Sequence, residues 1–168
     1  MLEYQHTIIN IKKLKKMRLI LLVIPLFIIS CNSSYEGKIS KVIDGDSYYL
    51  STGKEIRLYG CDAPENTLGH NQPYGREATL FAVNYLEGKI VKLNKMDKDK
   101  YGRDVCKVFI NDIDFTGLIV DNGLAWVYKK YSTENMYERE QVAKLKKMGL
   151  WQQSFPLAPY KFRKTYNL

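Results

Sequence analysis

Residues 55–65 read EIRLYGCDAPE, and this stretch decides the fold because it joins a strand to an acidic loop. Ile56 and Leu58 alternate with Arg57 and Tyr59, which is the period of a half-buried β-strand. The residues just past that strand place two carboxylates on either side of an Ala-Pro pair. The stretch therefore predicts a short strand with a charged loop at its end.

Turn signals and apolar spacing divide the rest of the chain into short elements. Asp44-Gly45-Asp46, Thr52-Gly53 and Asn111-Asp112 are typical of tight turns between strands. Strands are expected over residues 37–43, 48–50, 56–59, 89–94 and 105–110. Apolar residues at helical spacing predict helices over 78–86, closed by Gly88, over 115–122, ended by Gly123, and from Ser132 or Thr133 to Met148, with Gly149 as the C′ residue. This order predicts a small α+β domain, and an OB-type five-stranded barrel fits it.

The N-terminal segment has the pattern of an export signal. A positive cluster over 12–18 precedes eleven apolar residues over 19–29, fewer than the roughly 17–25 that span a bilayer. Residues 28–31 resemble the lipobox of bacterial lipoproteins, with Cys31 as the lipidated residue. We therefore expect a signal peptide over 1–31, a tether over 32–35, and an exported cell-envelope lipoprotein anchored to a membrane by lipid. A plain secretory signal or a short uncleaved anchor is the alternative.

Charge and cysteine content exclude two classes of protein. The chain of 168 residues has a net charge of +8, but residues 32–140 carry −2 and residues 141–168 carry +6. The middle of the chain is therefore not a uniformly basic clamp for nucleic acid. Three cysteines are too few for a disulfide-dense scaffold. Cys61 and Cys106 could form a disulfide or be buried as small apolar residues, and the sequence leaves both open.

Four short clusters carry the chemistry, although each is common when taken alone. In order they read VIDGDS at 42–47, RLYGCDAPE at 57–65, DKYGR at 99–103 and NGLA at 122–125. Together they resemble the staphylococcal nuclease family over about residues 36–153. The resemblance implies an OB-type five-stranded barrel with three helices, in agreement with the expected order of elements. It leaves residues 154–168 as a basic, aromatic C-terminal tail that wraps the domain, touches nucleic acid or is solvated.

The resemblance also implies a metal site. Asp46 and Asp62 match the two carboxylates that bind one Ca²⁺, and the carbonyl of Ala63 faces the same ion. Asp44 matches a supporting carboxylate. Ligands that are all oxygens suit a hard cation, and flexible loops favour Ca²⁺ over Mg²⁺.

Five further residues match positions that act on substrate. Arg57 and Arg103 match the arginines at the scissile phosphate, and Glu65 matches the residue that positions or deprotonates the attacking water. Lys100 and Tyr101 match positions near a terminal phosphate. A fixed, planar guanidinium suits a phosphodiester that gains negative charge in its transition state.

The expected function is a calcium-dependent, exported nuclease that hydrolyses DNA and RNA with low sequence specificity and leaves 3′-phosphate ends. No obligate protein partner is expected. The alternative is a non-catalytic OB-fold module that binds nucleic acid at the envelope, and a structural envelope lipoprotein is a third hypothesis. The joint presence of two acidic metal positions, a base and two arginines favours catalysis. Ser47 stands where threonine is usual, residues 66–75 differ from the staphylococcal loop, and Tyr128 and Tyr131 are candidates for stacking on a base or for core packing.

Overall fold

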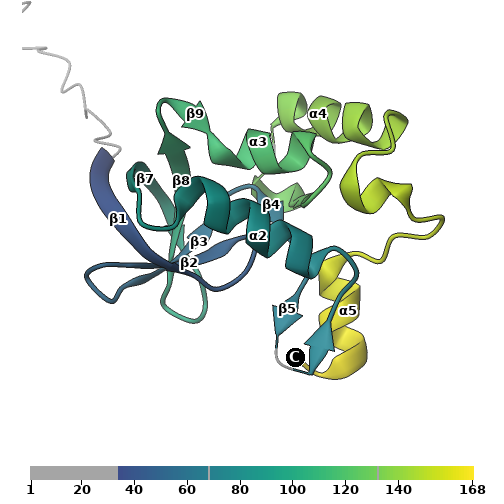
Figure 1. Cartoon of the computed structure of the whole chain (residues 1–168), viewed down its shortest axis with the longest axis horizontal. Helices are drawn as coiled ribbons and strands as arrows, with labels where there is room; N and C mark the ends of the chain where they lie inside the picture. The colour runs from purple at the N-terminus through teal and green to yellow at the C-terminus, as the bar shows by residue number, and fades with distance from the viewer. Residues whose placement is uncertain (1–33, 68, 132) are drawn as a thin grey trace, which may run out of the picture. The chain divides into compact units, whose positions relative to one another are not determined.

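Five strands close a barrel in the computed structural model, which describes residues 34–67, 69–131 and 133–168. The antiparallel meander β1–β2–β3 meets β7 at one edge, β7 pairs with β8, and a parallel pairing of β3 with β8 closes the circle (Figure 1). The strands are β1 (Ser34–Val42), β2 (Ser47–Leu50), β3 (Glu55–Leu58), β7 (Ile90–Lys98) and β8 (Asp104–Ile110). The predicted OB-type barrel is confirmed.

Alternation along the strands fills the barrel with apolar side chains. In β3, Ile56 and Leu58 are buried while Arg57 is half-buried, as the period of two predicts. Register shifts in β1 and β7 mark bulges, which bend strands and allow a sheet to close. The fully or almost fully buried residues contributed by the strands include Ile39, Tyr48, Ile56, Leu58, Val91, Leu93 and Val108.

Within the described part of residues 36–153, three α-helices accompany the barrel: α2 (Gly75–Leu86), α3 (Phe115–Asp121) and α4 (Glu134–Leu145). The number is the one that the family resemblance implies. Two boundaries were wrong by three residues, and α3 ends at Asp121, one residue before the predicted end. Helix α2 begins at Gly75, three residues before the predicted start, and α4 ends at Leu145 rather than at Met148. Lys147, at a φ of 52°, already has the left-handed conformation after α4.

Gly149 has a different role from the one predicted, because it begins the 3₁₀ helix η2 (Gly149–Gln152). A Cβ atom on Gly149 would lie 2.3 Å from the carbonyl oxygen of Gly123. The amide of Leu150 donates to that same oxygen over 2.8 Å. Glycine is required at position 149 because two backbone segments approach closely there, and not because a helix ends there.

Short strand pairs hold the loops against the barrel. β4 (Cys61–Asp62) pairs with β10 (Trp126–Val127), which is followed by η1 (Lys129–Tyr131), and β5 (Asn66–Thr67) pairs with β6 (His70–Asn71). β9 (Ile113–Asp114) forms the predicted hairpin with β8. Asn111 and Asp112 both have positive φ there, as a type I′ turn requires.

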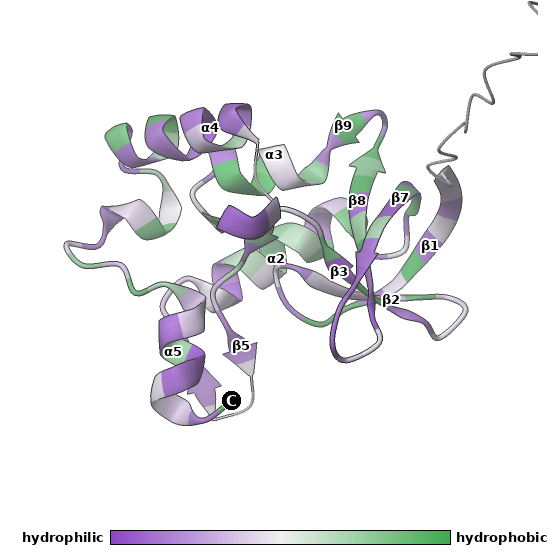
Figure 2. Cartoon of the chain, turned by 180° about the vertical axis from the view of Figure 1, so that it is seen from behind, coloured by the Kyte–Doolittle hydropathy of each residue, from purple (hydrophilic) through white to green (hydrophobic). Residues whose placement is uncertain are grey.

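The C-terminal tail ends in a helix, α5 (Pro159–Tyr166), which lies beside β5 and β6 (Figure 1). Figure 2 shows α5 as mostly hydrophilic with one hydrophobic band, and Phe162 is its buried aromatic residue. The ring of Tyr166 lies 5.0 Å from that of His70, and Gln72 Nε2 donates to the carbonyl oxygen of Leu157 over 2.6 Å. Of the arrangements left open for the tail, the structure has the one that wraps the domain.

The structure tests the expected tether over 32–35 and the possible disulfide between Cys61 and Cys106. Ser34 and Tyr35 pair with β7, so the tether expected over 32–35 overlaps the first strand. The signal peptide and its Cys31 lie outside the described residues. Within the part that is described, no helix has the length and apolar character to cross a membrane. Cys61 and Cys106 are buried free thiols, so they do not form the disulfide that the sequence left open.

Candidate active site

One guanidinium group joins the two carboxylates that were expected to bind metal. Arg57 Nη2 lies 3.0 Å from Asp46 Oδ2 and 2.6 Å from Asp62 Oδ1. The amide of Ala63 donates to Asp46 Oδ2 over 2.8 Å, and Ser47 Oγ donates to Asp46 Oδ1 over 3.1 Å. Asp46, Asp62 and Ala63 are buried. Loops separated in sequence therefore meet at Arg57.

Local structure explains this convergence. In the β2–β3 register Ser47 lies opposite Arg57, which places Asp46 next to the arginine, and β4 holds Asp62 in a strand pair with Trp126. A Cβ atom on Gly45 would lie 2.7 Å from the Cβ of Ala63. Only glycine lets this turn approach the acidic loop so closely.

The charges of this cluster shift its pKa values. Burial, together with repulsion from Asp46, raises the pKa of Asp44 to about 8, and Asp44 Oδ1 accepts the amide of Asp46 over 2.9 Å. The negative charge of Asp46 raises the pKa of Arg57, against the opposing effect of burial. Arg57 therefore stays protonated among the carboxylates.

The second expected arginine, Arg103, is held at the same site by two other carboxylates. Its Nε donates to Asp99 Oδ2 over 2.7 Å, and its Nη1 donates to Glu55 Oε1 over 3.1 Å. Asp99 Oδ1 also accepts the amides of Tyr101 and Arg103, which shapes the turn over 99–103. Burial lowers the pKa of Arg103, but the bonds to Asp99 and Glu55 more than offset this and raise it. Glu55 is a supporting residue that the sequence did not indicate.

Glu65 is positioned through its backbone by a residue that the sequence analysis missed. Its amide donates to Gln72 Oε1 over 3.1 Å, and the amide of Gln72 donates back to the Glu65 carbonyl over 2.9 Å. A Cβ atom on Gly75 would lie 2.1 Å from that carbonyl oxygen, so helix α2 begins directly against Glu65. Burial raises the pKa of Glu65, and Arg163 opposes the shift.

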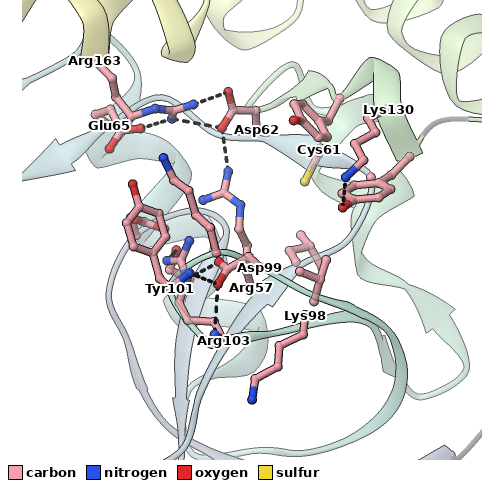
Figure 3. Close-up of a pocket in the computed structure, with 18 residues that line it drawn as sticks. Arg57, Cys61, Asp62, Glu65, Lys98, Asp99, Tyr101, Arg103, Lys130 and Arg163 are labelled. Carbon is pink, nitrogen blue, oxygen red and sulfur yellow. Dashed lines mark hydrogen bonds and ion pairs between the residues drawn. The ribbon is translucent and has the colours of Figure 1, made fainter.

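Arg163 is the other residue that the sequence did not place in the site. It extends from α5 and forms a fork on Asp62, with Nη1 3.1 Å from Oδ1 and Nη2 3.0 Å from Oδ2 (Figure 3). Its Nη1 also donates to Glu65 Oε1. Burial lowers the pKa of Arg163, and the bonds to Asp62 and Glu65 raise it overall. The sequence offered only the basic composition of the tail, 101 positions away from Asp62.

A cavity of about 580 Å³ lies in front of these groups. Tyr101 lies at its rim with 72% of its surface exposed, and the ammonium group of Lys100 lies 4.8 Å from its ring. Tyr128 and Tyr131, the stacking candidates, line the same cavity, and Tyr131 also donates to Asp97. The other expected site residues that line the cavity are Asp44, Arg57, Asp62, Glu65 and Arg103, whereas Asp46 and Ala63 are not among its lining residues.

The oxygen donors can be compared with the needs of a hard divalent cation. Among the described residues there is no group of three or more His, Cys, Asp or Glu side chains arranged to hold a metal. The expected set is smaller, with two carboxylates and one main-chain carbonyl. Asp46 Oδ2 and Asp62 Oδ1 both lie within 3.0 Å of Arg57 Nη2, so they converge on one point, which this nitrogen occupies and from which a cation would displace it. Buried, converging carboxylate oxygens fit Ca²⁺ or Mg²⁺.

Comparison with known proteins identifies the family of this chain. A family model described as "Staphylococcal nuclease homologue" matches residues 55–153, which is more than half of the chain. The chain belongs to the staphylococcal nuclease family. The match includes β3, the acidic loop and the turn that holds Arg103, and it ends before α5.

Relatives of this nuclease-family chain carry matching names. An "Uncharacterized endonuclease" of Escherichia coli O157:H7 is 32% identical over 132 residues, which are 76% of this chain and 84% of the relative. Another "Uncharacterized endonuclease", of Haemophilus influenzae, is 29% identical over 136 residues, 78% of this chain and 74% of the relative. "Staphylococcal-like nuclease CAN1" of Arabidopsis thaliana is 36% identical over 111 residues, 66% of this chain but 33% of the plant protein. The family and these names support nuclease activity.

Proposed function

We propose that this chain is a calcium-dependent, exported nuclease that hydrolyses phosphodiester bonds of DNA and RNA with low sequence specificity. The observation that carries the proposal is the contact of Arg57 with both Asp46 and Asp62, beside Glu65 and in the same cavity as Arg103. A module that only binds a polyanion gains nothing from carboxylates held beside its arginines, because they repel phosphate.

The two arginines would bind the scissile phosphate. A phosphodiester carries one negative charge and gains a second in its five-coordinate transition state. Arg57 and Arg103 offer planar donors from fixed positions, and only interactions that strengthen as this charge develops accelerate the reaction. Asp99 and Glu55 limit the movement of Arg103, so little reorganisation is needed when substrate binds.

Glu65 would act as the general base. Its carboxylate accepts a proton from water as the water oxygen bonds to phosphorus and the bond to the 5′-oxygen breaks. The departing 5′-oxygen takes up a proton from solvent water, Glu65 returns its proton to solvent, and the other product ends in a 3′-phosphate. A carboxyl whose pKa is raised by burial is a stronger base than one in water, which suits this role.

Asp46, Asp62 and the carbonyl of Ala63 would hold the Ca²⁺, and the bound cation would add positive charge next to the phosphate oxygens. With only two carboxylates, we expect a dissociation constant of about 10⁻⁴–10⁻³ M, as in extracellular calcium modules. Such a site suits an exported protein. Export by the signal over 1–31, with a lipid anchor on Cys31 or secretion without one, remains part of the proposal.

Cleavage assays on the full chain test this function. We expect DNA and RNA to be cut in Ca²⁺ and left intact in excess chelator, with 3′-phosphate ends identified by mass spectrometry. Glu65→Gln should retain binding but cut about 10²–10⁴-fold more slowly. Glu138→Gln, which changes an exposed glutamate on α4, is the matched control and should cut normally. Binding without cleavage by the unaltered chain would favour the non-catalytic module, and equal cutting in chelator would refute metal dependence.

A further inference from the structure

A third arginine enters the candidate active site from a part of the chain outside the family match. Arg163 belongs to α5, whereas the match ends at residue 153. In Figure 3 its guanidinium lies between Asp62 and Glu65, and it shares Asp62 Oδ1 with Arg57. The proposed reaction assigns no task to this arginine.

The contacts of Arg163 occupy the oxygen atoms that a cation would need. Asp62 Oδ1 accepts from both Arg57 and Arg163, and Asp62 Oδ2 accepts from Arg163 over 3.0 Å. Glu65 Oε1 accepts from Arg163 as well. A divalent cation binds carboxylate oxygens directly, at about 2.3–2.6 Å for Ca²⁺. It therefore requires lone pairs that Arg163 uses here.

Electrostatic repulsion also prevents Arg163 and a divalent cation from both binding strongly to Asp62 at the same time. A guanidinium and a divalent cation on one carboxylate repel each other, and partial burial increases that repulsion because it weakens solvent screening. Without a cation, Arg163 compensates the charge of Glu65 and shares with Arg57 the compensation of Asp62; the two carboxylate side chains are only 14% and 6% exposed. A buried carboxylate with no partner is strongly destabilising. Arg163 thus does for Asp62 what the cation would otherwise do.

The attachment of α5 allows this arginine to leave. Of the helix, only Pro159 and Phe162 are buried, and the Arg163 side chain remains 31% exposed at the cavity. Its guanidinium can turn toward solvent by rotation of its own side chain, while Phe162 keeps the helix in place. Arginine has several rotatable bonds, so this movement requires no change in the backbone.

We propose that Arg163 competes with the divalent cation for Asp62 and restrains Glu65 until the cation displaces it. The C-terminal helix then sets the cation concentration at which the site becomes active. The inference rests on the proposed function, because it assumes that Asp62 binds the cation. It assigns the tail a role in the reaction that its composition alone does not indicate.

Calorimetric titration of the full chain with Ca²⁺, in the absence of nucleic acid, tests the competition. Arg163→Gln removes the guanidinium and should bind Ca²⁺ about tenfold more tightly, the scale expected for loss of a charge-assisted fork that is partly exposed. Lys164→Gln removes the same charge from the next, exposed position of α5 and should leave the affinity unchanged. The Ca²⁺ concentration for half-maximal cleavage should fall by the same factor in Arg163→Gln alone.

Equal or weaker Ca²⁺ binding by folded Arg163→Gln would overturn the competition, as would an equal gain in Lys164→Gln. If Arg163→Gln does not fold, Arg163→Lys keeps the charge but loses the fork, and it should still bind Ca²⁺ several-fold more tightly than the unaltered chain. Unchanged binding in Arg163→Lys would then overturn the proposal. If the unaltered chain cleaves nucleic acid but Arg163→Gln binds Ca²⁺ no more tightly than the unaltered chain, the competition alone is refuted. Tighter binding in the variant without any cleavage refutes the nuclease proposal alone, and absence of Ca²⁺ binding in every variant refutes both.

Discussion

Replacement of Arg57 separates its role in stability from its role in catalysis. In the folded protein its Nη2 contacts Asp46 at 3.0 Å and Asp62 at 2.6 Å, and its side chain is 22% exposed. Arg57→Ala leaves two buried carboxylates without this shared partner. Asp62 keeps the fork from Arg163, whereas Asp46 loses its cationic partner. A buried charge left without any partner costs about 3–5 kcal/mol, so we expect the free energy of unfolding in chelator to fall by an amount toward the lower end of that range.

Calcium should restore part of this loss. A cation between Asp46 and Asp62 neutralises the charges that Arg57 leaves behind, so Arg57→Ala should be less destabilised in Ca²⁺ than in chelator. Cleavage should still fall by about 10²–10³-fold, the usual effect of removing one preorganised donor to a transition-state oxyanion. Urea unfolding with and without Ca²⁺, and kcat/KM on a DNA substrate, measure the two effects.

Arg57→Lys is the decisive control for geometry. It keeps the positive charge near Asp46 and Asp62, so most of the stability should remain. It lacks the planar fork, so cleavage should stay well below that of the unaltered chain. Arg57→Lys with full activity would refute the role of the guanidinium, and Arg57→Ala with unchanged stability in chelator would refute the energetic argument.

The remaining predictions concern acid stability and the backbone near Glu65. Burial raises the pKa of Asp104, but hydrogen bonds from Lys54 and Lys95 outweigh it and leave the pKa below its ordinary value. The stabilisation from these hydrogen bonds is therefore present above the pKa of the unfolded state, about 4, and is lost as the pH falls below it. Asp104→Asn should lower the free energy of unfolding by about 1 kcal/mol at neutral pH. In thermal melts at a series of pH values, the melting temperature of this variant should fall less steeply with acid than that of the unaltered chain. Gly75→Ala should lower the free energy of unfolding by about 1–3 kcal/mol and slow cleavage, because its Cβ would meet the Glu65 carbonyl at 2.1 Å; an alanine variant with normal urea unfolding and normal rates would show that this loop can move freely.

Local pattern was sufficient for most of the barrel and its helices. The alternation of Ile56 with Leu58 and the turn at Asn111-Asp112 depend on neighbours in sequence, and both were predicted with the correct structure. The end of α4 was not predicted correctly. Lys147 ends that region in a left-handed conformation, and Gly149 is explained by its contact with Gly123, which no local pattern reveals.

Some residues of the site were also predicted from the sequence, whereas others were found only in the structure. The family resemblance named Asp46, Arg57 and Asp62, and the structure brings these three into contact. Their roles in metal binding and catalysis remain predictions. Sequence analysis missed the support from Glu55 and Gln72, because a single glutamate or glutamine carries no signal until its partner is known.

The sequence by itself determined the strand periods, the turns and the residue types available for phosphate and metal chemistry, since these depend on interactions between close neighbours. Only the tertiary structure decided that the tail wraps the domain and that Arg163 reaches Asp62 and Glu65. That contact spans 101 positions and depends on the path of the whole chain around the barrel. The composition shows that the tail is positively charged, but the fold determines which carboxylate this charge contacts.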